Sequence, residues 1–401
     1  MSFNAGSVEV ILGGQFNPAG FAAFDGAVKK SAAHAATFES AHKKSMSRAS
    51  AATSIFGFTA GQAAAGGVAA LGAAVVASAV KFASFDKQLR TFQAVSGANQ
   101  KQLQSLSKAA QDLGVKFGVG ATQAASGATE LAKGGLTVAQ ILGGGLQAAI
   151  TLSVAGQMTL ADAASTTANA MNLFGLSGSQ AQHVADALSV SANATTADVS
   201  DFGMALSQAG SAAKTVGLSF NETVTALEAL ALAGVKNSDA GTSLKTMLLQ
   251  LANPTKKAKG VMDDLGLSFF TAQGKFKTLG DVSTMLRQKL GGLTAQQRAQ
   301  VAQTLAGTDG FRALLALYNQ GPAKLAGLEK GLNRQGAAAR QAEKQQKGLS
   351  GAWDKAKASL ENVMISLGKG LAPGLSDGLT HLAGVISQQV QNGNLERFGS
   401  L

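Results

Sequence analysis

The tripeptide Gly-Leu-Ser/Thr recurs along this chain and joins a helix-ending signal directly to a helix-starting one. A glycine just past a helix end adopts the left-handed conformation at little cost, and the next leucine can pack on the last turn. The hydroxyl residue then caps the following helix by accepting a hydrogen bond from a free N–H. The tripeptide begins at Gly135, Gly175, Gly217, Gly266, Gly292, Gly348 and Gly378. This punctuation predicts a succession of helices joined by short turns.

Four of these tripeptides continue as a capping box, in which Glu or Gln follows the hydroxyl residue by three positions. The pairs are Thr137–Gln140, Ser177–Gln180, Ser219–Glu222 and Thr294–Gln297. The first three boxes lie about 40 residues apart, which is the length of a two-helix repeat. We therefore expect stacked helical hairpins that form a compact core.

The composition agrees with a mainly α fold. Aromatic residues make up 5% of the chain, so the apolar surface consists mostly of Ala, Leu and Val, which suit helices that approach each other closely. Four prolines interrupt the chain, and the 49 glycines should mark helix ends or close helix contacts. Because cysteine is absent, disulfides and thiolate chemistry are excluded.

The tripeptide at Gly266 is the exception. Two short apolar runs follow it, with Gln273-Gly274 between them as a turn. This pattern predicts a small β-hairpin over residues 268–277, after which Asp281 should cap the next helix.

The sequence divides into four expected regions. Residues 1–48 predict a short strand, at 7–12, and a polar helix, and residues 49–81 predict an uncharged Ala/Gly-rich hydrophobic helix. Residues 82–321 form the expected helical core. Residues 322–401 predict an extended helical region that reads as truncated, because no terminating signal precedes Leu401.

Two apolar stripes mark the edges of this expected core. The first comprises Phe82, Phe85, Leu89, Phe92 and Val95, and a helix end is expected at Gly97. Residues 329–347 carry few large apolar groups and predict a solvent-exposed helix or a flexible link. The helix that follows has a stripe of Trp353, Ala356, Leu360, Val363, Met364 and Leu367, and Gly370 and Pro373 should stop it.

Residues 59–80 carry no charge and are long enough to span a bilayer. Alanine and glycine contribute little transfer free energy, however, so spontaneous insertion would be marginal. The alternatives are a constitutive transmembrane helix, a closely packed helix, and a segment that meets a membrane only transiently. A membrane-active protein that forms an oligomeric channel through small-residue packing is therefore the competing functional hypothesis.

The net charge of +11 comes from basic flanks around a mildly acidic middle. Contact with nucleic acid or with an acidic protein surface would explain such flanks, but no dense cluster of Lys and Arg with interleaved aromatics appears. Solvated helix faces explain the charge more simply, and no specific nucleic-acid binding is expected.

The sequence argues against an enzyme. The histidines, His34, His42, His183 and His381, have no metal-ligand spacing. Gly143-Gly144-Gly145 lacks the Lys of a phosphate loop and predicts a flexible break between helices. The pairs Asp198/Asp201 and Asp263/Asp264 could in principle act as general acid and base. Asp198 and Asp201 lie in a stretch that resembles the first turn of a helix, where carboxylates favour the helix dipole. No catalytic, cofactor-binding or metal-binding residues are therefore assigned, and no cofactor is expected.

The tract from Phe82 to Leu317 resembles the core of tail tape measure proteins of long-tailed phages and prophages. The matching segments begin at Glu130 (Glu-Leu-Ala-Lys-Gly-Gly-Leu-Thr), Ala170 (Ala-Met-Asn-Leu-Phe-Gly-Leu-Ser), Val184 (Val-Ala-Asp-Ala-Leu), Ala233 (Ala-Gly-Val-Lys-Asn-Ser-Asp-Ala-Gly-Thr-Ser-Leu), Leu251 (Leu-Ala-Asn-Pro-Thr) and Leu265 (Leu-Gly-Leu-Ser), and the turn at Gly274 follows. They occur in the order and at the spacing of that family.

This resemblance implies a structural protein of the virion that lies in the tail lumen and sets tail length, after assembly in the host cytoplasm. It implies as partners the major tail tube protein, tail assembly chaperones, tail tip or baseplate proteins and further copies of the chain in the tail. It also implies transient contact of residues 59–80 with a host membrane. Family members are usually longer, so this chain lacks most of the expected helical ruler.

Overall fold

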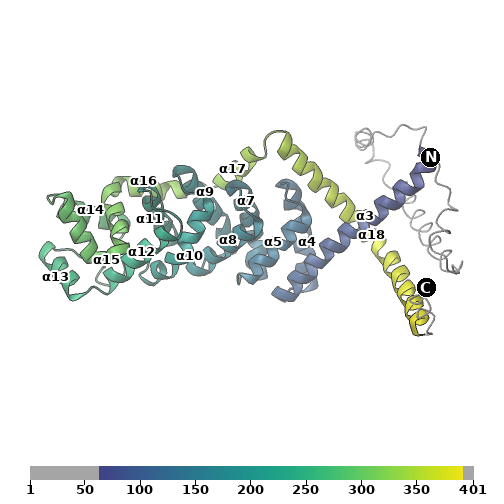
Figure 1. Ribbon diagram of the computed structural model, residues 1–401, viewed down its shortest axis with the longest axis horizontal. Helices are drawn as coiled ribbons and strands as arrows, with labels where there is room; N and C mark the ends of the chain where they lie inside the picture. Colours follow the sequence, from purple (N-terminus) through teal and green to yellow (C-terminus); the bar gives the residue numbers. More distant parts are fainter. Residues whose placement is uncertain (1–62, 392–401) are drawn as a thin grey trace, which may run out of the picture. The chain divides into compact units, whose positions relative to one another are not determined.

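The computed structural model describes residues 63–391, which form helices joined by short turns (Figure 1). The chain divides into two compact units. One is Ser84–Asn362, and the other joins the residues up to Ala83 to those from Val363 onward. The strand predicted at 7–12 and the polar helix predicted up to residue 48 lie outside the described residues, as do residues 49–62 of the expected hydrophobic helix.

The unit Ser84–Asn362 is built from two rows of helices. The first row contains α5 (Ala121–Lys133), α8 (Leu160–Phe174), α10 (Val199–Thr215), α12 (Asn237–Ala252) and α15 (Ala295–Gln320), each packed on the next. The second row contains α7 (Leu146–Gly156), α9 (Ala181–Ala194) and α11 (Phe220–Leu232). Successive helices from α7 to α12 alternate between the rows (Figure 1), so the predicted mainly α fold is confirmed.

The remaining helices close the two ends of this unit. At one end, α4 (Gln100–Lys116) packs on α5. At the other end, α13 (Lys256–Leu265) and α14 (Leu279–Leu290) pack on α15. The chain then returns through α16 (Pro322–Leu332), which packs on α11 and α9, and α17 (Ala337–Gln345), which packs on α9 and α7. Two long helices, α3 (Ala63–Ser96) and α18 (Leu349–Gln391), cross the boundary between the two units.

Glycines set the close spacing of the first row. A methyl group on Gly241 of α12 would lie 2.4 Å from the carbonyl oxygen of Ala205 on α10. A methyl group on Gly310 of α15 would lie 2.6 Å from the backbone nitrogen of Met247 on α12. Neither position has room for a side chain, so these helices meet backbone to backbone, as the small-residue composition predicts.

The punctuation by Gly-Leu-Ser/Thr is confirmed at most positions. All four predicted capping boxes are present, at Thr137, Ser177, Ser219 and Thr294. The five glycines with the expected left-handed conformation are Gly135, Gly175, Gly217, Gly266 and Gly348. Asn99 and Asp198 form two more capping boxes with Gln102 and Asp201.

Gly292 and Gly378 do not fit this rule. Gly292 lacks a positive φ, because the turn after α14 is closed by the N–H of Leu293, which donates to the carbonyl of Leu290 at 3.1 Å. Gly378 lies inside α18, which continues to Gln391. The stop predicted at Gly370 and Pro373 is therefore wrong: a proline removes one backbone hydrogen bond, and the helix is maintained by those on either side.

The β-hairpin predicted at residues 268–277 is also wrong. This segment forms one antiparallel bridge, between Phe270 and Phe276, and the described residues contain no strand. Two backbone hydrogen bonds flank this bridge, from the Thr271 N–H to the Lys275 carbonyl at 2.8 Å and from the Lys277 N–H to the Phe269 carbonyl at 2.9 Å, and the pairing extends no further. The side chains of Phe269 and Phe276 are buried instead. Thr278, rather than Asp281, caps α14 by accepting from the Asp281 N–H at 3.2 Å.

The three glycines 143–145 form an ordered kink rather than a flexible break. The short helix α6 (Val138–Gln140) leads into one π-helical turn, η3 (Ile141–Gly145), in which Gly144 has a φ of 139°. A methyl group on Gly144 would lie 2.5 Å from the carbonyl oxygen of Gly178, in the 3-10 turn η4 (Gly178–Gln180). The two glycine segments therefore meet backbone to backbone and place the first two capping boxes side by side.

One stretch among the described residues, Val138–Gly156, has the length and hydropathy of a membrane span. Its mean hydropathy is 1.5, but 61% of it is buried inside the protein, where α7 packs on α8, α9 and α17. The apolar character of this stretch is therefore explained by its place in the helical stack.

Candidate functional site

Residues 321–362 return along the helical stack, and we call this segment the strap. It comprises α16, α17 and the first part of α18 (Figure 1). Its buried apolar side chains are few and mostly small: Leu325, Leu332, Ala338, Ala342 and Ala358. Residues 329–347, for which the sequence predicts an exposed helix or a link, therefore bury one side of α17. Because the apolar contact is limited, polar contacts are important for holding the strap.

Asp186 on α9 holds the start of α17. The residue before this helix is Gly336, which has no side chain to cap it. The Asp186 carboxylate accepts the N–H of Gly336 at 2.7 Å and that of Ala338 at 2.9 Å, across about 150 residues of sequence. Asp186 is 3% exposed, and Gln182 also donates to it at 3.2 Å. A carboxylate at a helix N-terminus satisfies free N–H groups and favours the helix dipole.

Glu361 of the strap forms the reciprocal contact with the stack. The residue before α5 is Gly120, which again offers no capping side chain. The Glu361 carboxylate accepts the N–H of Thr122 at 3.2 Å and also the Thr122 hydroxyl. Nearby, the Asn362 amide donates to the carbonyl of Gln111 at 3.0 Å. Both helix starts that these two carboxylates bind lack a capping side chain of their own.

A third carboxylate, Glu228 on α11, lies 1% exposed beside the strap. It accepts the hydroxyl of Ser191 on α9 at 3.0 Å. Burial raises the pKa of Glu228 above its usual range, while the Ser191 hydrogen bond and the charge of Lys324 on α16 act in the opposite direction. Two acidic groups, Asp186 and Glu361, thus join the strap to the stack, whereas Glu228 bonds within the stack.

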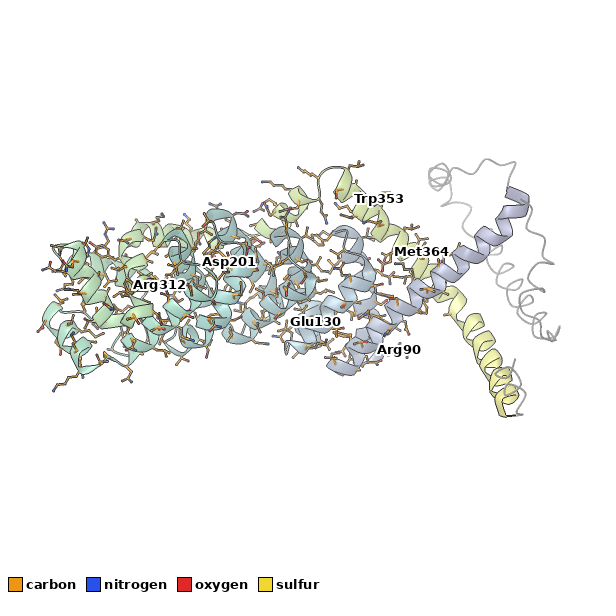
Figure 2. The ribbon with its side chains drawn as sticks, viewed as in Figure 1. Arg90, Glu130, Asp201, Arg312, Trp353 and Met364 are labelled. Atoms are coloured by element: carbon orange, nitrogen blue, oxygen red, sulfur yellow. The ribbon has the colours of Figure 1, made fainter. Side chains whose placement is uncertain are left out.

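Beyond these contacts, the first part of α18 exposes large apolar side chains. Leu349 is 88% exposed, Trp353 62% and Leu360 45%, and Val363 and Leu367 further along the helix are also exposed. Figure 2 labels Trp353 and Met364 on this helix. The opposite side of α18 buries Gly351, Ala358 and Ile365. The sequence predicts the stripe, but not that it faces solvent, and such a surface is typical of a protein–protein interface.

Three of the sequence's candidate residues, Asp198, Asp201 and His183, serve local structure. Asp198 and Asp201 form the capping box of α10, and a hydrogen bond from Ser200 lowers the pKa of Asp198. His183 shares a hydrogen bond of 2.7 Å with Asn221. His34 and His42 lie outside the described residues. Residues 63–391 bring no three His, Asp or Glu side chains together as a metal site would need.

Sequence reasoning missed Asp186 and Glu361, the two acids that hold the strap. The available signal was a glycine at the start of a helix: Gly120 and Gly336 cannot cap α5 and α17, so an acceptor has to come from elsewhere. Which acids supply it depends on contacts between residues about 150 or more positions apart.

The fold defines a class of protein: an α-helical protein built as a stack of hairpins. Residues 107–307 match the model of the family described as phage-related minor tail protein. The chain is 31% identical over 293 residues to the tape measure protein of Pneumococcus phage Dp-1, an alignment that covers 73% of this chain and 25% of that protein. The chain belongs to the phage-related minor tail protein family.

A second relative is the probable tape measure protein of Escherichia phage P2. It is 27% identical over 285 residues, which cover 65% of this chain and 34% of that protein. The chain thus matches a quarter to a third of the length of these curated relatives. No solved structure matches the chain.

Proposed function

We propose that this chain is part of a tape measure protein and acts as a structural scaffold, not a catalyst, in the assembly of a phage tail. The observation that carries the proposal is the alignment of 293 residues, at 31% identity, with a protein named as a tape measure protein. The partners proposed are the tail tube protein, the assembly chaperones and the tail tip or baseplate proteins. The proposed location is the tail lumen, reached after assembly in the host cytoplasm.

The long helices support a ruler function physically. An α-helix rises about 1.5 Å per residue, so the 43 residues of α18 correspond to about 65 Å. Hydrogen bonds within the helix fix this rise, so the number of residues translates directly into length. The compact stack has no such relation between residue number and length, because its helices fold back on one another. We therefore assign the ruler function to extended helices and an anchoring or nucleating function to the stack.

In-frame deletions in the phage that carries this gene test the proposal. Removing whole heptads from the helical part of the full gene should shorten the tail in proportion to the residues removed, as measured by electron microscopy. Duplicating the same heptads is the matched control and should lengthen the tail by the same amount. Deleting α12 from the stack should instead abolish tails. Tails of unchanged length in the heptad variants would contradict the ruler assignment.

An oligomeric membrane channel is not favoured, because the relatives are named as tape measure proteins. Transient membrane contact by residues 59–80 remains a separate proposal. Its support is the uncharged Ala/Gly-rich composition of that segment. Leakage from anionic lipid vesicles, compared between the full chain and a variant lacking these residues, tests it, and equal leakage would contradict the proposal.

A further inference from the structure

The three helices of the strap are separated by two short breaks, and a glycine lies at the end of each break. Residues 333–336 separate α16 from α17, and residues 346–348 separate α17 from α18. Gly336 has a φ of 72° and Gly348 a φ of 103°. Space does not require these glycines, because a methyl group on Gly348 would meet no atom within 4 Å and one on Gly336 would meet only the end of the Arg340 side chain, at 3.1 Å. They serve to turn the backbone out of the helix.

The residues around these breaks favour a continuous helix. Residues 337–347 are Ala, Arg, Gln, Glu and Lys, which have high helix propensities. No proline lies between Pro322 and Pro373, and Pro373 does not stop α18. At the start of the strap, Pro322 and Gly321, which has a φ of 77°, keep α16 from joining α15. Local preference therefore allows one helix from Pro322 onward, and the two breaks have to be imposed by other parts of the chain.

Contacts with the stack impose the breaks by replacing hydrogen bonds that a continuous helix would make itself. In such a helix, the N–H groups of Gly336 and Ala338 would donate to carbonyls four residues back in the strap. Asp186 accepts both N–H groups instead, at 2.7 and 2.9 Å. At the second break, the side-chain amide of Gln346 donates to the carbonyl of Phe117, which follows α4. The broken path of the strap thus depends on its contacts with the stack.

These contacts are limited in strength. The large apolar side chains that the strap buries are two leucines, Leu325 and Leu332, so detachment exposes little apolar surface of the strap. Between α16 and α11 two acidic groups approach each other, and burial and the charge of Glu222 both raise the pKa of Glu329. The docked strap is therefore held mainly by its hydrogen bonds to the stack.

We propose that the strap is a releasable arm, which detaches from the stack about a hinge at Gly321 and then joins the rest of α18 as one continuous helix over residues 322–391. Asp186 and Glu361 hold the arm in its docked state. In the released state, residues 322–348 would lengthen α18 by about 40 Å, at about 1.5 Å per residue.

This release would control when the strap becomes part of the ruler, so its purpose rests on the ruler function proposed above. Its existence does not, because release is measured on the purified chain and the ruler function on tail length. A strap that never detaches leaves the expected effect of heptad deletions unchanged, so the two proposals fail separately.

Paired spin labels on the purified full chain test the release. The chain contains no cysteine, so labels attach only where one is introduced. Gln157→Cys and Gln345→Cys label the stack and α17 at two exposed side chains that lie 2.5 Å apart. Adding Gly336→Ala and Gly348→Ala should favour release about a thousandfold, because at each break alanine favours helix and opposes a positive φ. Pulsed electron paramagnetic resonance should then show widely separated labels in place of a short distance.

The matched control is Gly327→Ala with Gly331→Ala, inside α16. Methyl groups at these two glycines would meet no atom closer than 4.0 Å, so the labels should stay together. A second label pair, Lys330→Cys with Lys344→Cys, flanks the first break and reports the helix itself. In the released state its backbone positions should lie about 21 Å apart with a narrow distribution. Labels on the stack and α17 that stay together in the alanine variant, or a broad distribution across the first break, would overturn the proposal.

Asp186→Ala tests the same release without changing the strap. The labels on the stack and α17 should again separate, because the two N–H groups at the first break lose their acceptor and can return to the helix. Circular dichroism should show helix content equal to or above that of the wild type. A loss of helix content on separation would mean that the strap unfolds, and would contradict the continuous helix.

Discussion

Asp186 offers the most direct test of how the strap is held. The substitution Asp186→Ala removes the acceptor for the N–H groups of Gly336 and Ala338, and no other side chain caps α17. The structure thus predicts that this single change on α9 loosens a helix that lies about 150 residues further along the chain.

The magnitude follows from the two hydrogen bonds that are lost. Removing a helix cap costs about 1 kcal/mol. The N–H of Ala338 is buried, and leaving such a donor unpaired costs about a further 1–3 kcal/mol. We therefore expect Asp186→Ala to destabilise the strap by about 2–4 kcal/mol. Asp186→Asn keeps one acceptor oxygen and should cost about half as much.

Native-state hydrogen exchange is the appropriate assay, because a stack of hairpins opens locally as well as globally. Asp186→Ala should raise the exchange rate of amides in α17 far more than that of amides in α10. The control is Asp112→Ala, which removes an exposed ion pair with Lys108 and should cost about 0.5 kcal/mol or less. Unchanged exchange in α17 would refute the capping function of Asp186.

Three further predictions concern packing, titration and capping. Gly241→Ala should lower the melting temperature, with a cost of about 1–3 kcal/mol, because its methyl group would collide with Ala205. The control is Gly260→Ala on α13, which has open space around it and should stabilise the protein by about 0.5–1 kcal/mol. Burial raises the pKa of Glu228, so the contribution of this carboxyl to the free energy of unfolding is full below its ordinary pKa of 4.5 and is lost as pH rises through its pKa in the folded protein. Glu228→Gln should therefore be more stable than the wild type at neutral pH in urea titrations, and the difference should vanish in acid. Ser219→Ala should cost about 1 kcal/mol in the same titrations, by removing the capping box of α11, and no loss would contradict that function.

The features of the fold that the sequence predicts are those set by residues a few positions apart in the chain. The capping boxes at Thr137, Ser177 and Ser219 involve residues three positions apart, so their geometry follows from the sequence alone. The side chains of Phe85, Leu89 and Phe92 are buried as predicted, because their spacing of three and four residues places them on one face of the helix. Val95, at the end of this stripe, is exposed. The hairpin prediction failed because the pairing within residues 268–277 is limited to one bridge, while the side chains of Phe269 and Phe276 are buried against the protein.

The sequence by itself determined where helices begin and end, because a glycine, a leucine and a capping hydroxyl act within one turn of backbone. It also determined that the helices pack closely, since the small side chains of Ala and Gly let helix backbones approach each other. Only the tertiary structure decided that the chain returns along its own stack, because Asp186 and Glu361 show no pattern in sequence that pairs them with their partners. It also decided that the stripe of Trp353 faces solvent, since burial depends on which side of α18 meets the protein.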